Sequence, residues 1–291
     1  MAKKPNGKLT SSAAGSSQTN VFILDDETKG PAKDIWYAPV IDGEVKGHGL
    51  VPRKHSIYPP EMFDPPTQLH LIPRSELSDR IKEQERLKSR ISDVLLAAGI
   101  PSMDQGSNGY CWSHSTVGCV QAVRALNNQP HVPLSAYAVA ATIKRGANEG
   151  GWCGLSAKFL REKGVPSQQL WPQGDRNYKK YDTPEVWANA ELHKVTEEWV
   201  DLTRNVYDAN LTFEQLATCL LTDVPCACDF NFWSHSVMVC DLVEVEPGSF
   251  GIRLRNSWTD SWGEKGFGIL RGSKAIPDGA LAIRVTGASP I

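Results

Sequence analysis

The spacing of apolar residues changes near residue 221, and this change limits the folds that the chain can adopt. Before it, apolar residues recur at helical spacing; after it, they alternate with a period of two along 234–245 and 250–256. Every second residue from His235 to Val245 is therefore expected on one face of a strand. Four helices are expected upstream: one from Cys111, one after Pro133 with Ser135 as its cap, one over 156–163 and one over 212–221. Helices followed by antiparallel strands predict an α+β fold.

Composition excludes several classes of protein. The 291 residues are 41% hydrophobic and 22% charged, which is usual for a folded globular chain. A formal charge of −2 gives no general electrostatic reason to expect nucleic-acid or membrane partners. The sequence has no long apolar run and no apolar segment near its N-terminus, so neither a transmembrane helix nor a secretory signal is expected. With seven scattered cysteines, these features favour a cytoplasmic protein with free thiols.

The chain divides into three expected regions. Residues 1–20 are polar and predict a flexible tail. Residues 21–98, here called the leader, contain a proline-rich stretch and one charged helix over 76–98, which Gly99 ends. Residues 99–291 carry the helices and strands described above and are expected to form the main domain.

The loop before Cys111 has the composition of a nucleophile site. Gln105-Gly106-Ser107-Asn108-Gly109-Tyr110 leads into an expected helix that begins at the cysteine. The free N–H groups and the dipole of a helix N-terminus favour an anion, and therefore a thiolate with a lowered pKa. Gln105 and the Cys111 N–H are candidate donors to an oxyanion that forms next to this sulfur.

A base and its orienting partner are expected from the strand pair. His235 and Asn256 lie near opposite ends of the expected hairpin, where paired strands bring distant residues together. An Asn carbonyl that accepts the imidazole N–H fixes the ring tautomer and directs the other ring nitrogen at the sulfur. Trp258 follows closely and is expected to shield that hydrogen bond from water.

Three segments resemble the signature motifs of the papain-like (C1 family) cysteine peptidases. They are Q-G-S-N-G-Y-C-W at 105–112, S-H-S-V-M-V at 234–239 and N-S-W-T-D-S-W-G from 256. The segment N-E-G-G-W at 148–152 is similar to the family's Asn-Gly-Gly stretch, which lines the substrate cleft. The resemblance covers about residues 101–285, and His235 lies slightly closer to the cysteine than the roughly 130–150 residues typical of the family.

The resemblance implies a role for each matching residue. Cys111 is the expected nucleophile, His235 the general base and acid, Asn256 the residue that orients it, and Gln105 an oxyanion donor. The expected substrate-binding residues are Gly150, Gly151 and Trp258. No metal or organic cofactor is implied. The family fold has a helical lobe and an antiparallel, barrel-like β lobe, with the active site in the cleft between them.

The sequence departs from the family pattern at several positions. Asn108 stands where a disulfide-forming cysteine is usual, and its expected partner before Gly150 is also missing, which suits a reducing compartment. His114 lies one helical turn from Cys111, where an aromatic residue is usual; we expect it to be a packed or hydrogen-bonded helix residue. The leader lacks the propeptide signature of secreted members. Both an inhibitory segment across the cleft and an assembly or targeting arm remain open for it.

Two functions are consistent with these residues. The first is a cysteine peptidase that hydrolyses peptide or protein substrates through an acyl-thioester, with a thiolate–imidazolium pair at rest. The second is a papain-fold binding or structural module, for example of a bacterial or phage-associated assembly such as a virion, with weak or latent peptidase activity and an assembly partner bound through the N-terminal arm. Transfer of the acyl group to an amine instead of water is a further possibility that these residues do not separate from hydrolysis.

Overall fold

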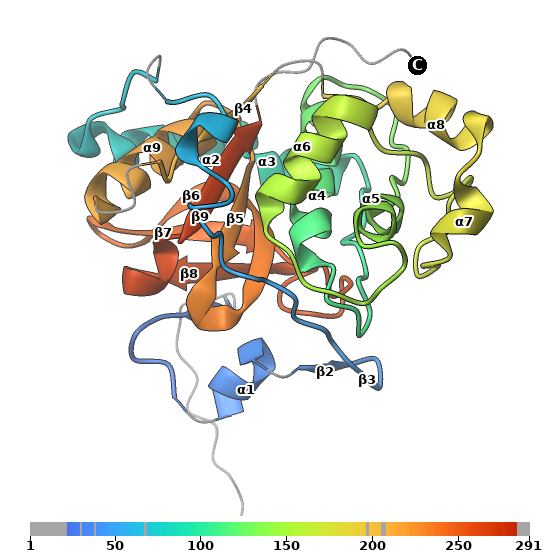
Figure 1. Cartoon of the computed structure of the whole chain (residues 1–291). Helices are drawn as coiled ribbons and strands as arrows, with labels where there is room; N and C mark the ends of the chain where they lie inside the picture. Colours follow the sequence, from blue (N-terminus) through green and yellow to red (C-terminus); the bar gives the residue numbers. More distant parts are fainter. Residues whose placement is uncertain are drawn as a thin grey trace, which may run out of the picture.

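The helices and strands segregate into two lobes in the computed structural model, as Figure 1 shows. The structure describes residues 22–29, 31–37, 39–66, 69–195, 198–204 and 208–283, so the expected tail over 1–20 lies outside the described residues. One lobe is mainly helical and the other is built on a sheet. The α+β class and the two-lobe architecture expected from the sequence are confirmed.

The helical lobe surrounds one almost completely buried helix. Its helices are α4 (Cys111–Leu126), α5 (Ala136–Ile143), α6 (Cys153–Lys163), α7 (Tyr178–Tyr181) and α8 (Pro184–Glu191). Every residue of α4 except Leu126 is buried, because this helix lies between the two lobes. The Ser135 hydroxyl caps α5 by accepting from the Ala138 N–H, and Gly164 ends α6 with φ +77°, both as the sequence predicts.

The second lobe is an open, mixed sheet. Its strands are β1 (Ile23–Leu24), β4 (Trp199–Asp201), β5 (Cys226–Phe230), β6 (His235–Glu246), β7 (Ser249–Arg255), β8 (Phe267–Arg271) and β9 (Gly279–Ile283). They run in the order β1-β8-β7-β6-β5-β9-β4. All pairs are antiparallel except β1–β8, in which the leader adds a parallel strand at one edge. The barrel-like, wholly antiparallel lobe that we expected is therefore an open sheet, with β1 and β4 at its edges.

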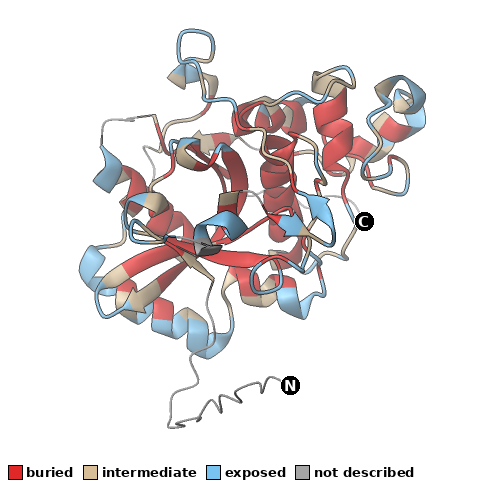
Figure 2. Cartoon of the chain, turned by 90° about the horizontal axis from the view of Figure 1, so that it is seen from below, coloured by how far each residue is buried: buried red, intermediate tan, exposed pale blue. Residues whose placement is uncertain are grey.

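Each face of the sheet packs against a different group of helices. Ala227, Met238 and Leu281 face α4, whereas Cys226, Cys228 and Val237 face the other side. That other side is covered by α2 (Leu77–Leu87) and α9 (Ala209–Leu221). Figure 2 shows the resulting distribution, with buried residues concentrated in the sheet and the adjoining helices and exposed residues on outer helices and loops.

A bulge in β6 corrects one expectation from the periodicity. Val237 and Val239 share a core cluster as predicted, but the next member on this strand is Leu242, not Asp241. The register of β6 against β7 shifts between Val239 and Asp241, and an extra residue on one strand reverses which side chains point to each face. Period-two alternation therefore holds only up to the bulge.

Three helices differ from the expected ones. Helix α6 starts at Cys153, three residues before the expected start at Ser156. The single helix expected over 76–98 is broken into α2 and α3 (Ile91–Ala97), because Lys88 adopts a left-handed conformation and its N–H bonds back to Gln84 and Glu85. Helix α9 starts before Thr212, and the cap is the Asp208 carboxylate, which accepts from the Leu211 N–H. An aspartate caps a helix as well as threonine does, so sequence alone left the start of α9 ambiguous.

The leader packs on the main domain over most of its described length. Its remaining elements are α1 (Pro31–Tyr37), β2 (Val40–Ile41), β3 (Glu44–Val45) and two 3₁₀ turns, Pro60–Met62 and Arg74–Glu76; two further 3₁₀ turns, Asn231–Trp233 and Gly272–Ala275, lie in the main domain. Leu24, Trp36 and Ile81 belong to the same core cluster as the sheet. In Figure 1 the chain between β3 and α2 runs over the boundary between the lobes. Within the described residues, no helix has the length and apolar character needed to span a bilayer.

Candidate active site

Cys111 lies at the first position of α4, on the boundary between the lobes. Its side chain is fully buried, and its N–H is one of the first amides of α4, which have no partner within the helix. The backbone of Ser236, on the facing strand β6, is in hydrogen-bonding reach of the sulfur. This contact places the thiol beside the strand that carries His235.

His235 and Asn256 form the hydrogen bond that the sequence predicts. His235 Nε2 lies 2.8 Å from Asn256 Oδ1, so Nε2 carries the proton and Nδ1 is left as the basic nitrogen. Among the described residues, Nδ1 has no hydrogen-bond partner. Trp258 stacks on the imidazole at 4.5 Å between ring centroids, with 28° between the planes, and so covers this pair.

Gln105 is held by a residue that sequence reasoning missed. The Ser257 hydroxyl donates to Gln105 Oε1 at 2.6 Å, and the Gln105 N–H donates to the Ser257 carbonyl at 2.9 Å. These two bonds orient the side-chain amide so that its Nε2 donates to Gly47 at 2.9 Å and to Asn108 at 2.8 Å. The only signal for Ser257 in the sequence is its position directly after Asn256.

The leader crosses the site through residues 46–51, here called the covering segment. The Gly47 carbonyl accepts from Gln105 Nε2 and, at 3.3 Å, from Trp258 Nε1. The His48 ring lies 5.1 Å from the His235 ring and 5.2 Å from the Trp258 ring. The Gln105 amide, which we expected to donate to the oxyanion, thus donates to a backbone carbonyl of the chain's own leader.

Gly151 binds the covering segment through both of its backbone groups. Its N–H donates to Gly49 at 2.9 Å and its carbonyl accepts from the Val51 N–H at 2.8 Å, in a parallel bridge centred on Leu50. A Cβ added to Gly150 would lie only 2.4 Å from the Gly49 carbonyl oxygen, so this position has no room for a side chain. The two glycines expected to bind an extended peptide therefore contact an extended segment of the chain itself, the covering segment.

Burial shifts the pKa values of Cys111 and His235. It raises the pKa of the Cys111 thiol to about 12, against opposing hydrogen bonds from the backbones of Ser236 and Gly49. It also lowers the pKa of His235 well below its usual value, and the nearby His48 adds to that effect. In this covered state, burial therefore favours a neutral thiol and a neutral imidazole over the thiolate–imidazolium pair expected at rest.

His114 is hydrogen-bonded at both ring nitrogens, as expected for a structural helix residue. Nδ1 lies 2.8 Å from the Tyr110 carbonyl and Nε2 lies 2.5 Å from the Gln173 side-chain nitrogen. Burial lowers the pKa of His114 to about 4. Both nitrogens are therefore engaged and the ring is neutral, which leaves His235 as the base.

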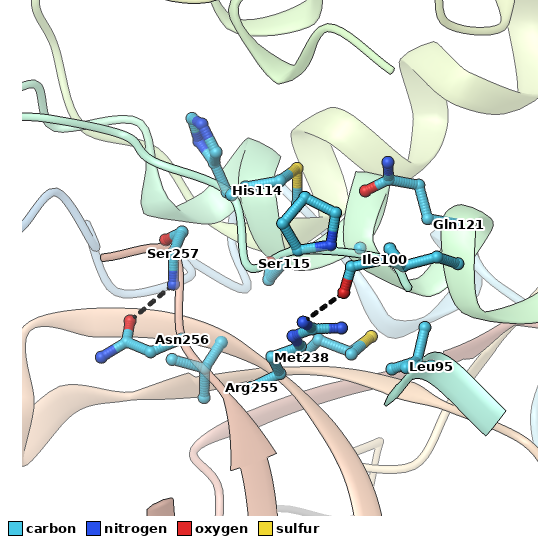
Figure 3. A pocket seen from close by; sticks show the side chains of 13 residues that line it. Leu95, Ile100, His114, Ser115, Gln121, Met238, Arg255, Asn256 and Ser257 are labelled. Carbon is cyan, nitrogen blue, oxygen red and sulfur yellow. Dashed lines mark hydrogen bonds between the residues drawn. The ribbon is translucent and has the colours of Figure 1, made fainter. Parts of the chain in front are cut away.

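A small cavity lies beside Asn256, between α4 and the β6–β7 hairpin (Figure 3). Asn256 and Ser257 line it and are joined by a 2.8 Å bond from the Ser257 N–H to Asn256 Oδ1. The cavity measures about 20 Å³, too small for a peptide side chain. Across the described residues, no group of three or more His, Cys, Asp or Glu side chains is arranged to hold a metal ion.

Comparison with known proteins identifies the family. The model of the papain family cysteine proteases matches residues 100–281. The chain belongs to this family. The matched range contains Cys111, His235 and Asn256, and it starts just after the leader ends.

Individual members are distant relatives of this papain-family chain. Zingipain-2 of Zingiber officinale is 24% identical over 212 residues, which cover 67% of this chain and 92% of zingipain-2. The thiol protease SEN102 of Hemerocallis is 21% identical over 65% of this chain. The match spans only 55% of SEN102, and about half of several other curated relatives.

Solved structures show the same fold. Xylellain, a cysteine protease from Xylella fastidiosa, is 18% identical and covers 82% of this chain and 97% of its own, with a TM-score of 0.57. Procathepsin L 3 from the larval midgut of Tenebrio molitor is 22% identical and covers 62% of this chain and 64% of its own, with a TM-score of 0.50. The xylellain similarity extends beyond the share of the chain that the family model matches, and so includes part of the leader.

Proposed function

We propose that this papain-family cysteine protease hydrolyses peptide bonds of peptide or protein substrates. The observation that carries the proposal is the His235–Asn256 bond at 2.8 Å, shielded by Trp258, on the strand that contacts Cys111. This arrangement leaves one imidazole nitrogen free as a base, on the strand whose backbone at Ser236 reaches the thiol at the N-terminus of α4. The papain-fold assembly module, the other function expected from the sequence, is not favoured by these relatives.

The reaction follows from the positions of these groups. His235 Nδ1 takes the Cys111 proton, and the thiolate forms a bond to the substrate carbonyl carbon. The resulting oxyanion receives hydrogen bonds from Gln105 Nε2 and the Cys111 N–H, and the His235 imidazolium then protonates the leaving amine. Water, deprotonated by His235, attacks the thioester and releases the acid. Transfer of the acyl group to an amine uses the same residues, and the mass of the product distinguishes the two reactions.

We infer that the leader is inhibitory, the first of the two roles expected from the sequence. The covering segment takes the Gln105 donor and both backbone groups of Gly151, so a substrate cannot use them until the segment moves. Lys46 anchors the segment through Asp104 at 2.9 Å and is itself buried. The intact mass of purified protein after incubation tests whether the enzyme removes its own leader. A loss of mass equal to the leader supports removal by cleavage, and a stable full-length species opposes such removal.

The test of the peptidase is replacement of the nucleophile. Wild-type protein is expected to hydrolyse fluorogenic peptides and to take one epoxysuccinyl inhibitor at Cys111, mapped by peptide mass spectrometry. Cys111→Ala is expected to do neither, because Cys111 is the proposed nucleophile and the other six cysteines are buried outside the three motifs that carry the proposal. Cys240→Ala, which removes another buried thiol on β6, is the matched control and keeps both properties. Hydrolysis by Cys111→Ala at the wild-type rate would refute the proposal.

We also propose a reducing, cytoplasmic location. All seven cysteines are free, and both positions of the family disulfide that the resemblance implies lack a cysteine. Cell fractionation with an antibody against the chain tests this proposal, and recovery of the protein only outside cells would oppose it.

A further inference from the structure

Two sets of hydrogen bonds hold the loop 105–110, which contains one expected oxyanion donor and directly precedes the other. The first set comes from the leader, where the Gly47 N–H donates to the Gly106 carbonyl at 2.9 Å. The Glu44 carboxylate also accepts from the Ser107 N–H, at 3.2 Å. These bonds are lost once this part of the leader moves away from the site. The second set comes from the main domain, so it determines the geometry of the loop when a substrate is bound.

The Tyr137 hydroxyl is one of the anchors in the main domain. Tyr137 lies on α5 and is 2% exposed. Its hydroxyl donates to the Gln105 carbonyl at 2.7 Å and accepts from the Asn108 side-chain amide at 2.7 Å. The Asn108 carbonyl in turn accepts from Gln105 Nε2 at 2.8 Å. One buried hydroxyl therefore holds both the backbone of Gln105 and the residue that its side chain contacts.

The segment before the two glycines holds the other end of the loop. Asn148 Oδ1 accepts from the Gly109 N–H at 2.8 Å. The adjacent Ala147 carbonyl accepts from the Tyr110 hydroxyl at 2.6 Å. Gly109 and Tyr110 are buried, and a buried donor that loses its acceptor is costly. The Cys111 N–H follows directly in the chain, so these bonds determine where the second donor points.

Hydrogen bonds thus join two segments that a disulfide would join according to the family resemblance. Neither residue 108 nor the segment before Gly150 has a cysteine. Unlike a disulfide, the bonds from Tyr137 and Asn148 are not reduced by thiols, which agrees with the reducing location proposed above. Their geometry matters for the reaction, because a displacement of about 1 Å at an active site can lower a rate by about a hundredfold.

We propose that Asn148 and Tyr137 are positioning residues of this peptidase, and that they hold both oxyanion donors in place through the loop 105–110. They act through Gln105 and the Cys111 N–H rather than on the substrate itself. This inference rests on the proposed peptidase function, because the donors affect a rate only if an oxyanion forms. The hold on the loop does not require catalysis and can be measured separately.

Kinetics of the full chain test the effect on the donors. Tyr137→Phe and Asn148→Leu are each expected to lower kcat by about tenfold with little change in KM, a part of the roughly 10²–10³ lost when an oxyanion donor is removed. Asn148→Asp keeps an oxygen acceptor for the Gly109 N–H and should keep the wild-type kcat. Alkylation of Cys111 by iodoacetamide forms no oxyanion, so its rate should not fall in any variant. A wild-type kcat in Tyr137→Phe and Asn148→Leu, or an equal fall in kcat and alkylation, would overturn the inference.

Two variants in the helical lobe are matched controls. Asn189→Leu removes a side-chain oxygen that accepts from the Ser167 N–H at 2.8 Å. Tyr181→Phe removes a hydroxyl that donates to the Asp175 carboxylate at 2.7 Å. Both bonds lie outside the loop 105–110, so both variants should keep the wild-type kcat. A fall in the controls as large as in the test variants would count against the inference.

Hydrogen exchange at the Gly109 amide tests the hold on the loop without catalysis. In a Cys111→Ala background, this amide should exchange at least about tenfold faster in Asn148→Leu than in Asn148→Asp, because the bond to the side-chain oxygen is lost. Equal exchange in the two variants would overturn the inference whatever the kinetics show. If the active protein cleaves no peptide while the two variants differ in exchange, the peptidase proposal fails and the hold on the loop is supported.

Discussion

The Ser257 hydroxyl holds the side chain of Gln105, the expected oxyanion donor, through a 2.6 Å hydrogen bond. It accounts for the orientation of Gln105, because the amide oxygen is fixed by the hydroxyl and the amide nitrogen must then point to the cleft. A glutamine side chain is otherwise free to rotate, and a donor that is not held in place loses much of its effect on the transition state.

Ser257→Ala is therefore expected to lower kcat by about tenfold with little change in KM, a part of the roughly 10²–10³ lost when an oxyanion donor is removed. Steady-state kinetics on a fluorogenic peptide measure both constants. Ser261→Ala, in the same loop but exposed and without contact to Gln105, serves as the control. An equal fall in both variants would show that the loop, not the hydroxyl, is responsible.

His48 makes the covered state sensitive to pH. Burial lowers the pKa of His48 and of His235, and the two rings are in contact. An imidazole with a lowered pKa binds fewer protons in the covered state than in the open one. The covered state is therefore fully stable above about pH 6.5, the ordinary histidine value, and loses stability as the pH falls below it.

Hydrogen exchange measures this loss directly. The Leu50 and Val51 amides are bonded to Ser234 and Gly151, so their protection reports on the covering segment. Protection, corrected for intrinsic exchange, should fall by up to about tenfold per pH unit per histidine below pH 6.5. His48→Gln should flatten this dependence and the exposed His70→Gln should not. The same slope in all three proteins would exclude His48 as its cause.

At the scale of elements, the covering segment depends on close contact between two backbones. A Cβ at Gly49 would lie 2.1 Å from the Gly109 carbonyl oxygen, and one at Gly47 would lie 2.4 Å from the Asn108 oxygen. Backbone atoms cannot yield to such a contact as a flexible side chain can. The segment fits only because these two positions are glycine.

Gly49→Ala is expected to displace the segment and to increase the rate of Cys111 alkylation by iodoacetamide at least about tenfold, because the open state gains the free energy of the clash. The matched control is Gly43→Ala, where an added Cβ meets nothing within 4 Å, although its φ of +80° makes the variant slightly strained. Near-UV circular dichroism verifies that both fold. Alkylation at the wild-type rate in Gly49→Ala would show that the segment does not protect the thiol.

Among the helices and strands, the sequence predicts some features and misses others. Local signals predicted α4, the Ser135 cap and the β6–β7 hairpin, because these depend on residues close in sequence. The break at Lys88 and the bulge after Val239 were missed, since nothing in the local pattern marks a left-handed residue or an extra residue in a strand.

The part of the site that lies in the sequence motifs could be predicted, and the part formed by the leader could not. The His235–Asn256 bond and its Trp258 cover follow from the motifs, but the path of the leader does not, because long-range packing decides it. One signal was present and unused: Gly47 and Gly49 flank His48, and two glycines around one residue are typical of a backbone that approaches another closely.

On the scale of the whole molecule, the leader is part of the core. Trp36 of α1 is 1% exposed, stacks on Phe22 at 4.8 Å and lies 5.0–5.1 Å from Trp262 and Trp233. The domain boundary expected near residue 98 stays a prediction, but removal of the leader would expose this aromatic cluster.

Trp36→Ala is expected to lower the free energy of unfolding by about 3–5 kcal/mol, the usual cost of deleting a buried aromatic side chain. Urea denaturation followed by fluorescence measures it. Ile35→Ala on the same helix, 43% exposed, should cost much less. Similar losses for both would show that α1 contributes through its helix rather than through the aromatic cluster.

The bond between Gln105 and the Gly47 carbonyl links the proposed inhibition to the proposed turnover. The amide that is expected to lower the barrier to hydrolysis is the same amide that holds the covering segment. A substitution that weakens it would produce an enzyme that is easier to open and slower once open. Natural variation at Gln105 cannot change the stability of the covered state without also changing the rate of hydrolysis.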